Sequence, residues 1–198
     1  MPAMGFSISW LAFEGLTKAD ALGRLSLTDT GHPDEANEAP FSAADLPTGW
    51  ALVFSNDFDF ASDARLAQLS AGATLLAGQV EEHVMYSSAR LFRDGACVWR
   101  IQHDAGCGLA HLDAEGRLPE TFAAARDAAL RELDEAGGEA SEVDFLFDVP
   151  VEVAADACGW RYDQDEFEWG QAEFTVAADP GATGSVAALM ARLFGRRR

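Results

Sequence analysis

The stretch TLLAGQVEEHVMYSSARLFRDGACVWRIQH, residues 74–103, decides the fold. It contains three runs with strand character in close succession, at 74–83, 85–92 and 96–103. The Asp94-Gly95 pair between the last two runs is typical of a tight hairpin turn. Two strands joined by so short a turn pair antiparallel. The stretch therefore predicts an antiparallel meander at the centre of the fold.

Side chains alternate between the two faces of a strand, which assigns the residues of the last run to faces. We expect one face of the run 96–103 to carry Cys97, Trp99, Ile101 and His103. The other face then carries Val98, Arg100 and Gln102. The large apolar side chains on the first face predict that this face meets the core.

Strands and helices are mixed on both sides of the meander. Further strands are expected at 6–13, 50–54 and 143–149, with short ones at 109–112 and 174–176. Helices are expected from Thr17, from Ser62 to about residue 71, from Pro119 to Gly137 and from Pro150 to Gly159. The polar stretch 28–48 is expected to be a surface loop with one helical turn near Ser42.

This mixture predicts an α+β fold whose sheet is mainly antiparallel and packed by helices. A doubly wound α/β fold is the alternative, weakened by the absence of a glycine-rich turn between a strand and a helix. We expect residues 1–177 to form a single domain. Residues 178–198 are expected to form a linker and an amphipathic helix with Leu189, Met190, Leu193 and Phe194 on its apolar side, ending in three arginines.

The charge of the chain excludes several classes of partner. There are 33 acidic and 14 basic residues among 198, a net charge of −19. Such a chain repels phosphate backbones and anionic membranes, so no nucleic acid and no membrane is expected as a partner. The negative charge is compatible with a basic protein partner. The alternative is that the charge only keeps the protein soluble. Because two bodies of this charge repel each other, a monomer is favoured.

The cysteines and the N-terminal residues bear on the compartment. Cys97, Cys107 and Cys158 are odd in number and form no CxxC pair, which fits a reducing compartment. The first residues lack the basic start of a signal peptide, and no apolar run approaches the roughly 20 residues that span a bilayer. We therefore expect a cytoplasmic protein.

The densest group of reactive side chains is His103, Cys107 and His111. Three such ligands plus water are what a catalytic zinc needs, so these residues are candidate metal ligands. Their spacing matches no recognised zinc motif, and glycines on both sides of Cys107 favour a solvent-facing loop after a strand. No metal or cofactor is therefore expected.

A second candidate group is polar and lies at the ends of the meander strands. Glu81, Glu82, His83 and Tyr86 come close to His103 if those strands pair antiparallel. A histidine oriented by a carboxylate can act as a general acid or base, so His83, His103 and Cys107 are candidate catalytic residues. The simpler interpretation is a polar strand end with a chain reversal.

The segment WRYDQDEFEW, residues 160–169, combines aromatic and acidic side chains. Aromatic rings and carboxylates together attract arginine-rich surfaces through cation–π contacts and ion pairs. The candidate partner-binding residues in this segment are Trp160, Tyr162, Asp163, Asp165, Glu166 and Trp169. The alternative is an edge strand that buries its rings and solvates its acids.

These observations leave three functions open. The first is a non-catalytic protein-binding module of an immunity or regulatory kind, because steering toward a basic partner needs only a negative surface. The second is a small hydrolase or metal-dependent enzyme that uses His83, His103, Cys107 and His111. The third is an accessory domain whose C-terminal helix docks on another chain. The first is the leading hypothesis, with no catalytic residue assigned.

Overall fold

The computed structural model describes residues 5–180. The expected C-terminal helix, with Leu189, Met190, Leu193 and Phe194, lies outside the described residues. Within residues 5–180, no helix is long and apolar enough to cross a membrane.

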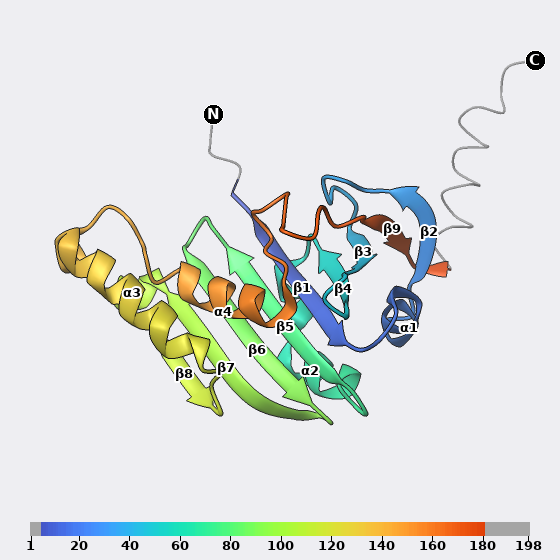
Figure 1. Cartoon of the computed structure of the whole chain (residues 1–198), viewed down its shortest axis with the longest axis horizontal. Helices are drawn as coiled ribbons and strands as arrows, with labels where there is room; N and C mark the ends of the chain where they lie inside the picture. Colours follow the sequence, from blue (N-terminus) through green and yellow to red (C-terminus); the bar gives the residue numbers. More distant parts are fainter. Residues whose placement is uncertain (1–4, 181–198) are drawn as a thin grey trace, which may run out of the picture.

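One antiparallel sheet organises the described residues, which confirms the predicted α+β fold with a mainly antiparallel sheet (Figure 1). The strand order is β2-β9-β3-β4-β1-β5-β6-β7-β8. The strands, in chain order, are β1 Ser7–Glu14, β2 Thr28–Pro33, β3 Phe41–Asp45, β4 Trp50–Ser55, β5 Thr74–Glu81, β6 Tyr86–Arg93, β7 Ala96–Asp104, β8 Asp113–Gly116 and β9 Thr175–Ala178.

The predicted meander is strands β5, β6 and β7, each paired antiparallel with the next. Asp94 and Gly95 both have positive φ, as a tight hairpin of this type requires. Trp99, Ile101 and His103 are buried together as expected, but Cys97 is exposed. The register shifts by a bulge after Leu91, so Cys97 pairs with Phe92 and leaves the predicted face.

Helices cover the two faces of the sheet unequally. Helices α3 (Thr121–Glu135) and α4 (Asp148–Cys158) pack on one face, over β5 to β7 (Figure 1). Helices α1 (Lys18–Arg24) and α2 (Asp63–Leu69) bury their apolar residues on the other face. Short 3-10 turns η1 (Phe58–Ala61), η2 (Ala105–Cys107) and η3 (Gly138–Ala140) lie between the elements. The Thr17 side chain caps α1 at the backbone N–H of Asp20, as its sequence predicts.

Two predicted segments are wrong. The stretch 28–48 is not a loop, because it contains the edge strand β2 and the inner strand β3. Strand β2 escapes detection because its polar side chains face water, and β3 because its buried residues are Ser42, Ala43 and Ala44, which have little strand propensity. The stretch 143–149 is not a strand, because it leads into α4, which begins at Asp148.

Two short strands are also displaced from their predicted positions. The expected strand 109–112 is not formed, and the pairing with β7 falls on the next residues, Asp113–Gly116. The expected edge strand at 174–176 begins one residue later, and it lies between β2 and β3 instead of at an edge.

A close contact between Trp10 and Gly78 fixes the middle of the sheet. Trp10 on β1 pairs with Gly78 on β5, and its indole lies against the glycine backbone. A Cβ at Gly78 would meet the Trp10 ring at 2.0 Å, so only glycine fits there. Trp10 is 1% exposed, and Trp160 and Tyr162 also pack against its ring. The indole therefore cannot shift to make room for a side chain at position 78.

We therefore expect Gly78→Ala to destabilise the fold. Overpacking of a core costs on the order of 1–3 kcal/mol, and this contact places the new methyl inside the ring. Gly23→Ala is the matched control, because Gly23 lies in the last turn of α1 with open space for a Cβ. This control should stabilise by up to ~1 kcal/mol. Urea unfolding measures both, and equal midpoints for Gly78→Ala and the native chain would contradict the packing.

Candidate functional site

A groove is formed where the segment 160–174 meets the loop between β2 and β3. The segment leaves α4, crosses the sheet and enters β9 (Figure 1). The groove has a volume of about 390 Å³, within the range of about 300–1,000 Å³ typical of binding sites. Its lining residues are Glu35, Ala36, Asn37, Trp160, Tyr162, Gln164, Asp165, Phe167, Gln171, Ala172 and Phe174.

The floor of the groove is aromatic and rigid. Trp160 is 3% exposed and makes edge-to-face contacts with Trp10, Phe54 and Phe174, with ring centroids 5.8–6.2 Å apart. The chain reaches this position because Gly159 ends α4 with a positive φ. The floor is thus anchored in the core under the centre of the sheet.

The thiol of Cys158 lies beneath this floor. It is buried and points at the carbonyl oxygen of Trp160, 3.6 Å away. Burial raises the pKa of the Cys158 thiol to about 11, so it remains protonated and unreactive near neutrality.

Tyr162 forms one wall. Its ring stacks on Trp10 at 6.0 Å and meets the edge of Phe6 at 5.3 Å. Its hydroxyl donates to Glu82 Oε1 at 2.9 Å. Burial and then this carboxylate raise the pKa of Tyr162, so the phenol stays neutral and acts as a hydrogen-bond donor.

The opposite wall is the loop that carries Glu35, Ala36 and Asn37, and buried Asp34 shapes it. The Asp34 carboxylate accepts from the backbone N–H groups of Glu38 at 3.0 Å and Ala39 at 3.1 Å. Its own N–H donates to the carbonyl of Phe174 at 2.9 Å. The loop is thereby tied to the far end of the segment 160–174, so both walls are held in place before any ligand arrives.

The rim carries carboxylates without basic partners. Within residues 5–180, neither Glu35 nor Asp165 forms an ion pair, and both are exposed. The same holds, among the described residues, for the neighbouring Glu166, Glu168 and Glu173. Among residues 5–180, no ion pair of these carboxylates has to break before a ligand binds them.

The six predicted partner-binding residues divide by their place around this groove. Trp160 is in its floor, Tyr162 in its wall and Asp165 on its rim. Asp163 instead pairs with Arg161 at 2.6 Å. Glu166 is exposed beside the groove, and Trp169 stacks on Phe167 at 4.8 Å.

The sequence does not single out Glu35 and Asn37, because the whole stretch 28–48 is expected to be a surface loop. The available signal is Asp34 followed by Asn37, since both residue types fix tight turns through side-chain hydrogen bonds.

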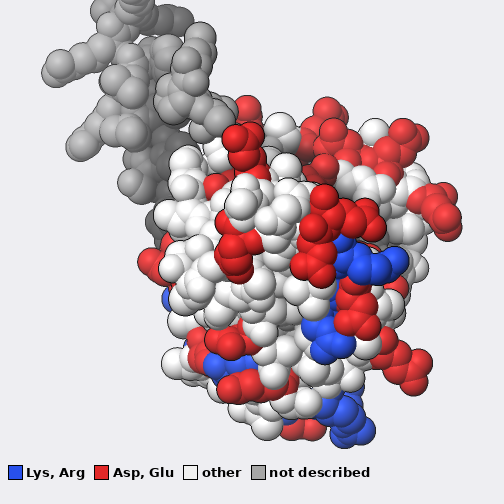
Figure 2. All heavy atoms as spheres, turned by 90° about the vertical axis from the view of Figure 1, so that its left-hand side faces the viewer, with Lys and Arg blue, Asp and Glu red and all other residues white. Residues whose placement is uncertain are grey.

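The surface charge alone does not mark a site. On the face shown in Figure 2, acidic side chains are scattered over the surface, and basic side chains lie beside some of them. What distinguishes the groove is therefore an aromatic floor combined with carboxylates that form no ion pair within residues 5–180.

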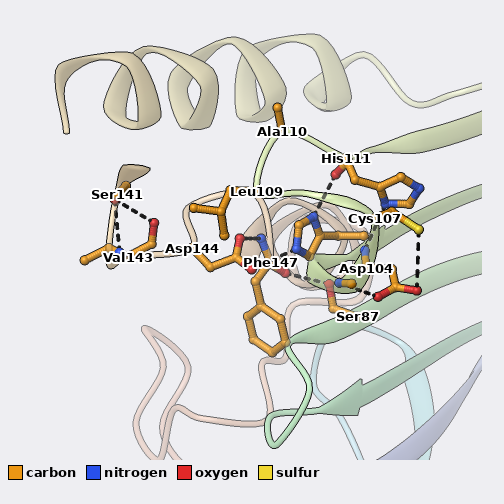
Figure 3. Close-up of polar contacts among 12 residues, drawn as sticks. Ser87, Asp104, Cys107, Leu109, Ala110, His111, Ser141, Val143, Asp144 and Phe147 are labelled. Carbon is orange, nitrogen blue, oxygen red and sulfur yellow. Dashed lines mark hydrogen bonds and ion pairs between the residues drawn. The ribbon is translucent and has the colours of Figure 1, made fainter. Parts of the chain in front are cut away.

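The predicted His103 group forms a buried structural contact. Figure 3 labels its partners Asp144 and His111. The His103 side chain is 0% exposed, with Nε2 2.8 Å from Asp144 Oδ2 and Nδ1 2.7 Å from the carbonyl oxygen of His111. Asp144 also accepts from the backbone N–H of Phe147 at 3.2 Å, and Ser87 Oγ donates to the Phe147 carbonyl at 2.6 Å. These bonds fasten the chain before α4 to strands β6 and β7.

The proton arrangement follows from the acceptors around the ring. The Nδ1–H donates to the His111 carbonyl and the Nε2–H donates to the Asp144 carboxylate. With both ring nitrogens protonated, His103 is an imidazolium paired with Asp144. Burial alone would lower the pKa of His103. The hydrogen bond to Asp144, the carbonyl of His111 and the charges of Asp144 and Asp104 outweigh burial and raise that pKa above 6.5.

The remaining candidate metal ligands lie in the loop after β7. His111 Nδ1 accepts from the backbone N–H of Asp104 at 3.0 Å, and its Nε2 lies 3.3 Å from Asp113. Cys107 Sγ is exposed and 3.9 Å from Asp104 Oδ2 (Figure 3). His103 and His111 rings are 6.1 Å apart. Among the described residues, no group of three His, Cys, Asp or Glu side chains is arranged to hold a metal ion.

The other candidate base, His83, is far more exposed. Its Nδ1 lies 2.6 Å from Glu81 Oε1, and its side chain is 57% exposed. Ser7 donates to the same carboxylate and, as the largest cause, lowers the pKa of Glu81. Tyr86 pairs with Glu81 in the sheet but packs its ring on Phe58. His83 and His103 thus have separate hydrogen-bond partners.

A small polar pocket of about 210 Å³ lies on the other face of β6 and β7. There Asp63 accepts from Arg90 at 2.5 Å and from Arg100 at 3.0 Å. Burial would raise the pKa of Asp63, but the two guanidinium groups lower it. Because the single carboxylate already occupies both arginines, this cluster links α2 to the sheet.

No family model, curated protein or solved structure matches the chain.

We expect Asp144→Asn to destabilise the protein and to remove a pH dependence. Breaking a buried ion pair costs about 3–5 kcal/mol. Because the His103 pKa is raised, its contribution is complete below pH 6.5 and is lost as the pH rises through the folded-state value. Urea unfolding at a series of pH values above 6.5 should show this decline in the native chain and a flatter profile in the variant.

His83→Gln serves as the control for that experiment, since its exposed pair contributes little. An unchanged profile in Asp144→Asn would show that the His103 proton is not coupled to folding.

Proposed function

We propose that the protein is a non-catalytic binding module for a basic protein partner, of an immunity or regulatory kind. The observation that carries this proposal is the preformed groove with an aromatic floor and unpaired carboxylates on its rim. A flat guanidinium group fits such a site, because it can lie on an aromatic face while its N–H groups donate to carboxylates.

The overall charge supports the same class of partner. With a net charge of −19, the protein attracts basic molecules over a distance and increases the rate of encounter. Such long-range attraction is not specific, since carboxylates are scattered over the surface. We assign the specificity to the groove, where two walls fixed by Tyr162 and Asp34 define a shape.

The alternative, a small hydrolase or metal-dependent enzyme, has less support. A general base must reach the substrate, and the His103 ring is fully buried with both nitrogens bonded to protein oxygen atoms. Cys107 and His111 are accessible, but neither forms a nucleophile–base pair with the other among the described contacts. The groove therefore gives the stronger hypothesis.

The double substitution Glu35→Lys with Asp165→Lys tests the groove. Glu132→Lys with Glu135→Lys is the matched control, because it changes the net charge equally on exposed positions of α3. We expect the groove variant to bind a nine-residue arginine peptide about tenfold more weakly, since two contacts worth about 1.4 kcal/mol together are lost. The control should lose much less. Tryptophan fluorescence, with Trp160 in the floor, measures the affinity.

Equal losses in the two variants would show that the peptide binds through diffuse charge and that the groove is not the site. A photo-crosslinking side chain at Gln171, on the groove, extends the test to cells. Adducts with a basic protein are expected there and not with the same group at Glu135. Adducts of the same composition at both positions would oppose the proposal.

A further inference from the structure

The C-terminal residues of this chain have the chemistry that the groove accepts. Residues 181–198 read GATGSVAALMARLFGRRR and contain four of the 14 basic residues and none of the 33 acidic ones. Their apolar residues include Leu193 and Phe194, which Gly195 separates from the three terminal arginines. An arginine-rich segment with neighbouring apolar side chains complements a groove with an aromatic floor and an acidic rim.

The groove is within reach of this segment. Phe174 lines the groove and directly precedes β9. Residue 181 follows Phe174 by seven positions, which is at most about 25 Å of extended chain. The 18 residues from 181 onward can span up to about 60 Å, so the arginines can return to the groove with length to spare. A short tether of this kind gives an effective concentration in the millimolar range.

Two other hollows suit the segment less well. The hollow between α1 and α2 is lined by Arg24 and Arg65, which repel further arginines. The groove between α3 and α4 has an alanine-rich lining with Glu152, Asp156 and Arg161, and none of its described lining residues is aromatic. It therefore offers no ring on which a guanidinium group could lie. The aromatic floor and the short connection from Phe174 through β9 therefore favour the groove beside β9.

We infer that residues 181–198 of the same chain occupy this groove and compete with a basic partner for it. The inference rests on the proposed function, because it concerns the same site. A partner then binds only by displacing the segment. Its apparent affinity is reduced by the ratio of the effective concentration to the intrinsic dissociation constant of the segment, about tenfold for a constant near 0.1 mM.

The test uses full-length chains and a fluorescein-labelled peptide of residues 185–198 as the probe. In one variant the arginines of the segment are neutralised, as Arg192→Gln, Arg196→Gln, Arg197→Gln and Arg198→Gln. The control removes the same charge from the folded body, as Arg93→Gln, Arg117→Gln, Arg126→Gln and Arg131→Gln. Fluorescence anisotropy should show about tenfold tighter binding of the probe to the segment variant than to the native chain. The control should show a much smaller change.

Two further combinations assign the gain to the groove. Adding Glu35→Lys and Asp165→Lys to the segment variant should abolish the gain, whereas adding Glu132→Lys and Glu135→Lys should preserve it. Equal affinity of the native chain and the segment variant would overturn the inference, and so would a gain that survives the groove substitutions. A native dimer that the segment variant converts to a monomer would place the segment on a second copy and also overturn it.

Failure of the proposed function gives a different result. In that case the nine-residue arginine peptide does not distinguish the groove variant from its charge-matched control, whatever the C-terminal segment does. If only the inference about the segment fails, the arginine peptide still requires the groove, and neutralising the segment leaves its affinity unchanged.

Discussion

The contact between the Trp10 indole and the bare backbone of Gly78 is the constraint on which the groove depends. A large ring can lie flat against a central strand only where the partner strand has no side chain. Trp160 and Tyr162 then pack on the outer side of that ring. Gly78 therefore determines the position of Trp10, and Trp10 in turn determines the position of Trp160 in the groove floor.

The two walls of the groove are fixed by different interactions, which explains why the whole is rigid. Tyr162 is held by ring stacking and by the carboxylate of Glu82, from the turn between β5 and β6. The other wall is held by the hydrogen bonds of Asp34, whose backbone is tied to Phe174. Among the described residues, neither wall is held by the exposed carboxylates of the rim, so a ligand can bind these carboxylates without breaking a contact of either wall. A site of this kind loses little conformational entropy when a ligand binds.

The sequence predicts the centre of the fold well because the signals there are local. Alternating apolar residues and the Asp94-Gly95 turn specify β5, β6 and β7 without reference to the rest of the chain. Strands β2 and β3 escape because polar edges and small residues form strands only when a neighbour supplies the pairing. The same limit applies to the groove. Its aromatic half is visible in residues 160–169, but Glu35 and Asn37 join it through the pairing of β9 between β2 and β3.

The burial of Cys158 divides the three thiols of this protein into two kinds. Cys97 and Cys107 are open to water, whereas the Cys158 thiol is enclosed beneath Trp160 and kept protonated. An oxidant therefore modifies the first two while the protein is folded, and it reaches the third only when the end of α4 and the groove floor separate. Oxidation of Cys158 therefore requires local unfolding at the end of α4 and the groove floor. Because the oxidised sulfur persists after refolding, its presence reports that such local unfolding has occurred.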